Sequence, residues 1–294
     1  MTAESLIAHW QGRGALERLG DVDCFVVDLY QSAPGVPVVW LHGFPSSSLD
    51  WRAAIDELGE SHRMLLMDFP GFGMSARPKG YNYSLVEQAD RVLAMLARRG
   101  IDRVHLIAHD MGTSVACELL ARRARGELPV SIESLLLTNG SIYIELARLT
   151  LSQKILRSPM AALYARMARW PLFRWQIGRL FKTPVDETEL QAMWQLMTRE
   201  RGLEALTRAI VYIDERYQHY RRWTEPLANF DRPTTIVWGR GDPVAVAAIG
   251  ERLAATMPMA NAVWLDDCGH FPMLEAPTAF ATAVRRHLAG VPDS

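Results

Sequence analysis

Three polar residues stand at the ends of separate apolar segments, in an order that could support covalent catalysis. Asp110 lies in "HLIAHDMGT", Asp242 in "WGRGDPV" and His270 in "DDCGHFP". The first stretch has the outline of a strand, a tight turn of small residues and a helix, which exposes the side chain at the turn as a nucleophile. Asp110 would attack carbon, His270 would deprotonate a water, and Asp242 would hold the imidazole in one tautomer.

Each of these residues also has a structural explanation, since Asp and Gly commonly end strands and a single histidine often only makes hydrogen bonds. Three of them in this order, each after a separate strand, favour the catalytic interpretation. Backbone N–H groups of Phe44, in "LHGFP", and Met111 would complete the set by stabilising an oxyanion. His42 precedes them in the same loop and is expected to make a structural hydrogen bond.

The chain must then supply strands that end at these residues. Apolar, β-branched runs predict seven buried strands: "DCFVVDL", "VPVVWLHG", "RMLLMDFPG", "RVHLIAHD", "IESLLLTNG", "TTIVWGRGD" and "NAVWLDDCGH". Helical patterns lie between them near 48–58, 84–99, 111–125, 244–257 and 275–289. This alternation predicts an α/β fold with a doubly wound, mostly parallel sheet. Reactive groups collect at the carboxyl ends of the strands in such sheets.

The alternation stops between 141 and 228. This segment has helical patterns rich in Arg, Trp, Met and Tyr but no convincing strand. We interpret it as a helical cap inserted over the active edge of the sheet, with peripheral helices as the alternative. The predicted organisation is a core formed by residues 1–140 and 229–294 around a cap formed by residues 141–228.

Several motifs together resemble a known superfamily. "HGFPSSSLDW", "DFPGFGMSARP", "AHDMGT", "GRGDPV" and "CGHFP" are similar to stretches of α/β-hydrolases, over nearly the whole chain. Within the superfamily they resemble the branch of epoxide hydrolases and haloalkane dehalogenases, which use an aspartate nucleophile. The resemblance implies an α/β-hydrolase fold with a cap, a triad of Asp110, Asp242 and His270, and no metal or organic cofactor.

An aspartate nucleophile suits substitution at saturated carbon. Its carboxylate forms an alkyl ester that water can hydrolyse, whereas a serine attacking an epoxide or an alkyl halide would leave an ether. Dehalogenases of this branch typically place Trp after the nucleophile to bind the halide, but this chain has Met111 there and Phe44 in the other donor position. Neither side chain donates a useful hydrogen bond. This favours an epoxide, although Trp170 or Trp175 could supply a donor.

An epoxide oxygen needs an acid, and epoxide hydrolases of this branch use two cap tyrosines. The resemblance points to Tyr212 as the second of them, since it lies about one long helix before the triad acid. Tyr164 is the candidate for the first, although its surroundings depart from the motif of the family. Amphipathic packing is the alternative explanation for both tyrosines.

The composition limits the classes of partner that we expect for this chain. The chain has 294 residues and a formal net charge of −1, which gives no indication of nucleic acid or of an anionic membrane surface as a partner. No run is apolar and long enough for stable membrane insertion. Three scattered cysteines argue against a disulfide framework and favour the cytoplasm.

The predicted activity is therefore the opening of a small apolar epoxide by water, with the oligomeric state left undefined by the sequence. A haloalkane dehalogenase is the alternative from the same branch. An ester or lactone hydrolase and a binding protein that keeps the fold without turnover also remain open.

Overall fold

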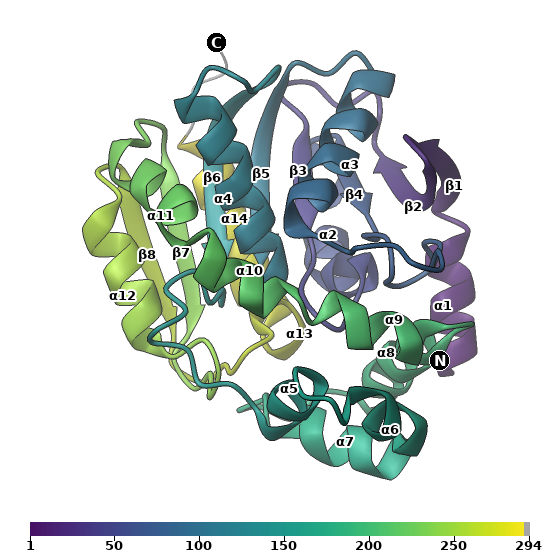
Figure 1. The fold of residues 1–294 in the computed structure, drawn as a ribbon. Coiled ribbons are helices and arrows are strands. Elements are labelled where there is room, and N and C mark those ends of the chain that lie inside the picture. Colours follow the sequence, from purple (N-terminus) through teal and green to yellow (C-terminus); the bar gives the residue numbers. More distant parts are fainter. Residues whose placement is uncertain (291–294) are drawn as a thin grey trace.

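The computed structural model describes residues 1–290, so the last four residues of the predicted core segment 229–294 lie outside the described residues. An eight-stranded sheet forms its centre, with strand order β1-β2-β4-β3-β5-β6-β7-β8 (Figure 1). β2 pairs antiparallel with both β1 and β4, and every other pair is parallel. The mostly parallel sheet predicted from the sequence is confirmed. The strands are β1 (Gly14–Leu19), β2 (Val22–Leu29), β3 (Val38–Leu41), β4 (Met64–Met67), β5 (Arg103–His109), β6 (Ser131–Thr138), β7 (Thr234–Gly239) and β8 (Ala260–Leu265).

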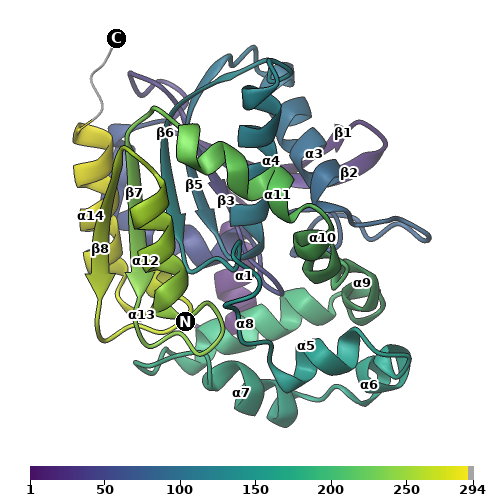
Figure 2. The same ribbon diagram turned by 60° about the vertical axis from the view of Figure 1, so that its left-hand side comes forward.

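Helices cover both faces of this sheet. In Figure 2, α14 and α12 lie on opposite sides of β7 and β8, while α3 and α4 share the side of α12. The helices of the core are α1 (Ala3–Gln11), α2 (Arg52–Leu58), α3 (Leu85–Arg98), α4 (Met111–Ala124), α12 (Ala247–Thr256), α13 (Pro272–Glu275) and α14 (Pro277–Ala289), with the short 3₁₀ helices η1 (Ser48–Trp51) and η2 (Gly59–Ser61).

The strands in the middle of the sheet are buried on both faces, which explains their continuous apolar sequences. All four residues of β3 and of β4 are buried. β1 is the exception, because only Leu19 of its six residues is buried. Its charged, exposed edge sequence did not predict a strand, and α1 was not predicted either.

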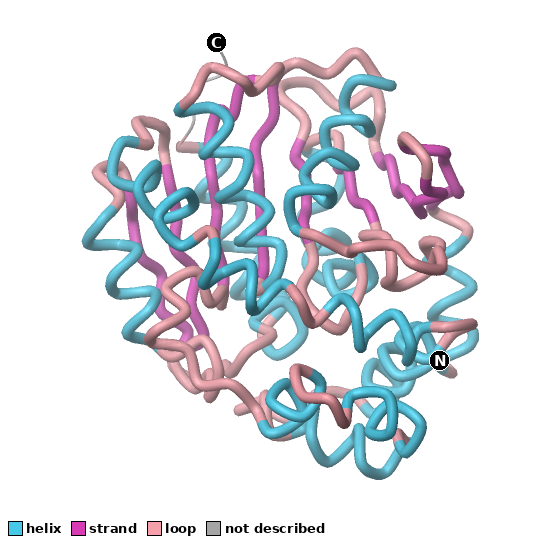
Figure 3. Tube along the Cα trace, in the orientation of Figure 1, coloured by secondary structure: helices cyan, strands magenta, loops and turns pink. Residues whose placement is uncertain are grey.

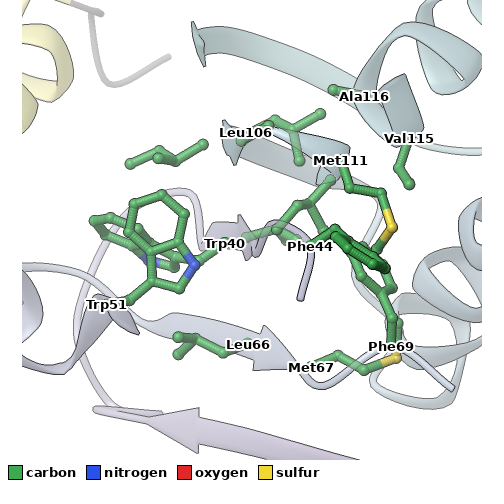
Figure 4. Packing of buried hydrophobic residues seen from close by; sticks show 14 of the residues in the cluster. Trp40, Phe44, Trp51, Leu66, Met67, Phe69, Leu106, Met111, Val115 and Ala116 are labelled. Atoms are coloured by element: carbon green, nitrogen blue, oxygen red, sulfur yellow. The ribbon is translucent and has the colours of Figure 1, made fainter. Parts of the chain in front are cut away.

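The apolar core continues to the carboxyl ends of the strands. The rings of Trp40 and Trp51 pack with their centroids 5.2 Å apart. In Figure 4 the side chains of Phe44, Phe69 and Met111 lie together beyond the ends of β3, β4 and β5. Packed apolar side chains, most of them aromatic, therefore support the edge of the sheet that carries the predicted reactive groups.

Between β6 and β7 the chain contains only helices and loops, as Figure 3 shows. These helices are α5 (Leu151–Leu156), α6 (Ala161–Met167), α7 (Trp170–Gly178), α8 (Glu187–Thr198), α9 (Gly202–Ala209), α10 (Tyr212–Gln218), α11 (Tyr220–Thr224) and η3 (Glu225–Asn229). In both ribbon views α5, α6 and α7 form the lower end of the molecule, below the carboxyl ends of the parallel strands.

The helical segment is tied to the core by a buried carboxylate. Glu118 of α4 accepts hydrogen bonds from Arg122, from Arg222 and from the indole of Trp223. Although burial opposes its charge, these donors lower the pKa of Glu118 to about 2. α11 is thereby fixed against α4. No helix formed by residues 1–290 has the length and hydropathy needed to cross a membrane.

Candidate active site

Asp110 lies at a sharp turn between β5 and α4. Its backbone has φ 43° and ψ −107°, a conformation that non-glycine residues rarely adopt. The turn is possible because small residues surround it: a Cβ on Gly112 would lie 2.4 Å from the carbonyl oxygen of Leu41. The backbone of α4 therefore approaches β3 closely, and the Asp110 side chain is presented at the end of the sheet.

Two groups contact the carboxylate of Asp110. The backbone N–H of Phe44 donates to Oδ2 at 3.0 Å, and Nη2 of Arg216 lies 3.4 Å from Oδ1. Burial alone would raise the pKa of Asp110, but the charges of Arg216 and His270 and the Phe44 N–H lower it overall. The carboxylate is therefore kept ionised in a buried position, which the role predicted for it would require.

Arg216 is itself held in place by α4. Its Nη2 donates to the backbone oxygen of Asp110 at 2.9 Å, and its Nε donates to the hydroxyl of Ser114 at 2.8 Å. The guanidinium lies 4.7 Å from the ring centroid of Tyr212, and the arginine side chain is buried. A helix of the inserted segment thus places a cation directly against the turn that carries Asp110.

Met111 is the first residue of α4. At this position a helix leaves its backbone N–H without an intrahelical acceptor, and the partial positive charge of the helix N-terminus is greatest there. The Phe44 N–H approaches the Asp110 carboxylate from the loop after β3. The two backbone groups predicted to form an oxyanion hole therefore belong to the two segments that flank Asp110.

His270 and Asp242 form a buried pair. Nδ1 of His270 donates to Oδ2 of Asp242 at 2.6 Å. Asn139, at the end of β6, donates to the same oxygen at 2.8 Å. Oδ1 of Asp242 accepts the N–H groups of Val244 and Ala245 at 2.7 and 2.9 Å. Both oxygens of the carboxylate are therefore fixed, and the imidazole is held in one orientation with Nε2 available for chemistry.

The electrostatic environment of His270 favours the imidazolium. Burial opposes the charge, but the carboxylate of Asp242, its hydrogen bond and the charge of Asp110 together raise the pKa of His270 to about 9. Near neutral pH the resting site therefore holds His270 as a cation opposite the Asp110 anion.

The loop that carries His270 is fastened by Glu275. Its carboxylate accepts the N–H groups of Gly269 and Phe271 from the loop, at 2.8 and 3.2 Å. It also accepts the N–H groups of Lys182 and Thr183, at 2.7 and 3.0 Å. The histidine loop and the chain after α7 are thereby joined through one side chain.

Two other histidines near the site make hydrogen bonds that hold the backbone in place. Nδ1 of His42 donates to the carbonyl oxygen of Gly43, and its Nε2 accepts the N–H of Phe69 at 2.9 Å. Nε2 of His109 donates to the carbonyl oxygen of His270 at 2.8 Å, and burial lowers the pKa of His109 to about 3. Both rings are neutral and fix loops. The structural role expected for His42 agrees with these contacts.

Asp110 and His270 open onto one cavity of about 110 Å³ between the sheet edge and the inserted helices. Most of its wall is apolar. Side chains from α5–α9 supply much of that wall, among them Leu156, Phe173, Ile177, Trp194 and Met197. The polar exceptions include Gln153, Gln176 and Tyr164. Such a cavity suits an apolar molecule that exposes few polar atoms.

The two candidate tyrosines differ in position. Tyr164 lines the cavity and donates its hydroxyl proton to Oε1 of Gln176 at 2.8 Å. Tyr212 is fully buried behind the wall, with its ring centroid 5.2 Å from that of Phe44. Its hydroxyl accepts a hydrogen bond from Gln153, a residue of the cavity wall, at 2.9 Å. Burial raises the pKa of Tyr212 well above its usual range, so it keeps its proton.

Three residues of this arrangement escaped the sequence analysis: Arg216, Asn139 and Glu275. Asn139 follows β6, so the rule that selected the other residues at strand ends could have found it. Arg216 and Glu275 lie within helices and carry no local signal. Among residues 1–290, no group of three His, Cys, Asp or Glu side chains is arranged to hold a metal ion.

Comparisons with known proteins show which family of proteins this chain resembles. A model of the "Alpha/beta hydrolase family" matches residues 38–283. LipZ of Mycobacterium tuberculosis, which carries the name of a hydrolase, is 40% identical over 257 residues, covering 86% of this chain and 89% of LipZ. The human mesoderm-specific transcript homolog protein is 35% identical over 269 residues, covering 86% of this chain and 80% of that protein. The stretches "LLLTNG" and "YIDERYQHYRRW" predict this second similarity, which is confirmed.

Solved structures extend the similarity of fold. The haloalkane dehalogenase DbeA from Bradyrhizobium elkani superposes with a TM-score of 0.80 at 19% identity, covering 95% of this chain and 98% of that one. An esterase from Exiguobacterium antarcticum superposes with a TM-score of 0.76 at 17% identity, covering 93% of this chain and 98% of the esterase. At these identities the likeness concerns the fold alone.

Proposed function

The chain belongs to the α/β-hydrolase family, and from that membership and the geometry of its cavity we propose that it hydrolyses small apolar epoxides to diols. The observation that carries the proposal is the position of Asp110. Its ionised carboxylate stands at the turn before α4, under the Phe44 N–H and in one apolar cavity with His270. A carboxylate so placed can form an alkyl ester.

The reaction would proceed in two steps. In the first, one carboxylate oxygen of Asp110 attacks a ring carbon of the epoxide, and the carbon–oxygen bond of the ring breaks as its oxygen takes a proton. In the second, His270 removes a proton from water, and the hydroxide attacks the ester carbonyl. The N–H groups of Phe44 and Met111 stabilise the resulting oxyanion. As it collapses, the alkyl oxygen leaves with the proton that His270 took from water, which gives the diol. The proton left on the Asp110 carboxyl returns to the acid of the first step, which regenerates the carboxylate.

The charges of the site support this division of labour. The resting imidazole of His270 has a pKa of about 9, partly because it faces the negative charge of Asp110. Formation of the ester removes that charge, so the pKa of His270 must fall when the ester forms. The imidazolium then loses its proton to solvent, so the histidine becomes a base only after the nucleophile has reacted.

The acid that protonates the ring oxygen belongs to the inserted helices in this proposal. Tyr212 keeps its proton, and Gln153 donates to its oxygen rather than accepting from it. The phenolic proton therefore stays available, directly behind the cavity-lining residues Gln153 and Phe44. Tyr164 reaches the cavity directly, but its proton is directed to Gln176.

We expect Tyr212→Phe to slow ester formation from an epoxide about 10²-fold, the lower end of what a general acid contributes. Release of a halide needs no proton, so the same variant should leave ester formation from a haloalkane unchanged. Stopped-flow single-turnover measurements separate this step from hydrolysis. Tyr143→Phe is the matched control, since the hydroxyl of Tyr143 is bonded to Thr256 rather than to a cavity residue. Equal rates for Tyr212→Phe and wild type would remove Tyr212 from the mechanism.

A haloalkane is the second candidate substrate, favoured by one observation. Trp194 lines the cavity, so an indole is within reach of a bound ligand. The two tryptophans considered from the sequence do not contribute: Trp175 is 58% exposed, and Trp170 packs against Phe173 and Trp194.

A substrate panel tests the proposal. Wild-type protein is incubated with apolar epoxides, haloalkanes, esters and lactones, and diol, halide and acid are measured. We expect diol from epoxides, and none from Asp110→Asn, because the amide cannot attack. Hydrolysis of esters alone, or turnover that survives in Asp110→Asn, would contradict it, and binding without turnover would favour a non-catalytic relative. We propose the cytoplasm as its location, on the basis of the scattered cysteines.

A further inference from the structure

Positive charge is concentrated in one part of the chain. Between residues 146 and 185 the sequence contains eight Lys and Arg residues and no Asp or Glu, although the whole chain has a net charge of −1. The basic residues are Arg148, Lys154, Arg157, Arg166, Arg169, Arg174, Arg179 and Lys182. The average over 294 residues therefore conceals a strongly cationic segment, which contains α5, α6 and α7.

The same three helices and their connections expose large apolar side chains. Six of the ten exposed large hydrophobic residues found among residues 1–290 lie here. They are Leu151, Met160, Leu163, Met167, Leu172 and Trp175, and we call them, with the neighbouring basic residues, the α5–α7 face. Met167 is 63% exposed and Trp175 58%. Large exposed apolar patches, especially those bordered by polar residues, mark sites of interaction with proteins or membranes.

Several of the cations on this face lack an acidic partner. Among the described residues, no carboxylate lies within ion-pair distance of Lys154, Arg166 or Arg169, and the guanidinium of Arg179 instead lies 5.1 Å from the ring centroid of Trp175. By contrast, Arg157 is paired with Asp214. The unpaired charges are free to meet an anionic surface.

The location of the face suits a flat partner. α5, α6 and α7 form one end of the molecule in both ribbon views (Figures 1 and 2), so no other element projects beyond them. The opposite sides of α6 and α7 line the cavity with Tyr164 and Phe173, while Leu172 is exposed and also lines it. A molecule that leaves a lipid layer at this face would be close to the cavity.

We propose that the α5–α7 face docks peripherally on an anionic phospholipid surface. Arg166, Arg169 and Lys154 would contact the headgroups, and Met167 and Trp175 would enter the boundary between headgroups and acyl chains. Lys and Arg together with exposed Trp and Leu side chains are typical of surfaces that bind at the membrane interface, and cationic residues near an anionic surface strengthen such binding. This binding requires no catalysis, so it can be tested whether or not Asp110 acts as proposed.

Sedimentation with vesicles measures the partition coefficient of the full chain. We expect binding to phosphatidylglycerol–phosphatidylcholine vesicles, little binding to pure phosphatidylcholine, and weakening with added salt. The double variant Arg166→Glu with Arg169→Glu should bind at least tenfold more weakly, since each cation near an anionic surface contributes about fivefold. Met167→Ser should also weaken binding, and this loss should persist at high salt.

Matched controls lie at the other end of the strands. Arg232→Glu with Arg286→Glu changes the net charge by the same amount, and Met259→Ser removes a methionine that is also exposed. Thermal unfolding verifies that each variant is folded. Equal binding by the α5–α7 variants and these controls would overturn the proposal, as would equal binding to neutral and anionic vesicles. It would also be overturned if duplex DNA were bound through Arg166 and Arg169 and vesicles were not.

Discussion

His270→Gln should accumulate an ester on Asp110 that the wild-type protein hydrolyses. Attack by the carboxylate does not need the imidazole, whereas activation of water does, so only the second step loses its base. We expect steady-state turnover to fall by about 10³- to 10⁴-fold while the first step persists. Intact-protein mass spectrometry after quenching with acid measures the trapped species, and peptide mapping assigns it to Asp110.

The mass of the trapped ester also identifies the substrate class. Opening an epoxide transfers every atom of the substrate to the enzyme, so the protein gains the full substrate mass. A haloalkane loses its halide, and the gain is smaller by the mass of the hydrogen halide. The double variant His270→Gln with Asp110→Asn is the control and should gain nothing.

A single turnover of wild type in ¹⁸O water completes the test of this mechanism. Attack on the ester carbonyl places the label on the Asp110 carboxylate, because the oxygen from water stays with the enzyme. Label found only in the product of that first turnover would show that water attacks the substrate directly. Asp110 would then act as a general base, and the covalent mechanism would be wrong.

Arg216→Met should shift the acid limb of kcat/KM to higher pH. In the wild type the charge of Arg216 helps to lower the pKa of Asp110 against the opposing effect of burial. Without it the carboxylate takes up a proton at a higher pH and loses its nucleophilicity there. Arg216→Lys should give a smaller shift, since the ammonium keeps the charge but cannot bond to Ser114 and Asp110 together as the guanidinium does.

Arg216→Met should also lower the free energy of unfolding by about 3–5 kcal/mol, the usual cost of removing one partner from a buried ion pair. A carboxyl group whose folded pKa is lowered contributes stability above its unfolded pKa and loses it as the pH falls through the folded value. Arg216→Met raises the folded pKa of Asp110. The loss of unfolding free energy relative to wild type should therefore be larger at neutral pH than at acidic pH. Thermal unfolding at several pH values measures this.

Arg222→Met is the matched control, because Arg222 also binds a buried carboxylate, that of Glu118, which does not line the cavity. It should lower the unfolding temperature without moving the acid limb. If the pH profile of Arg216→Met coincides with that of wild type, Arg216 does not set the ionisation of Asp110.

The sequence predicted those features that depend on local pattern. The strands of the sheet and the positions of Asp110, Asp242 and His270 at strand ends follow from apolar runs and from the residues that stop them. β1 was missed because an exposed edge strand carries charged residues and buries only Leu19 fully.

Features that depend on how the helices pack against one another could not be predicted from the sequence. Which tyrosine reaches the cavity is decided by the docking of α6 and α10, which places Tyr164 in the wall and Tyr212 behind it. Arg216 meets Asp110 across 106 positions of sequence. Trp194, rather than Trp175, faces the cavity for the same reason: the register of a helix on its neighbour has no local signature.

The four N–H groups that Glu275 gathers have a mechanical consequence. They join the loop of His270 to the chain at Lys182 and Thr183, so neither segment can swing away without leaving a carboxylate and several amides unpaired. The N–H of His270 also donates to the carbonyl oxygen of Leu180 at 2.8 Å, which adds a second tie at the same place. The side of the cavity that Leu180 lines is therefore fixed, and a change in the width of the cavity must come from other parts of its wall.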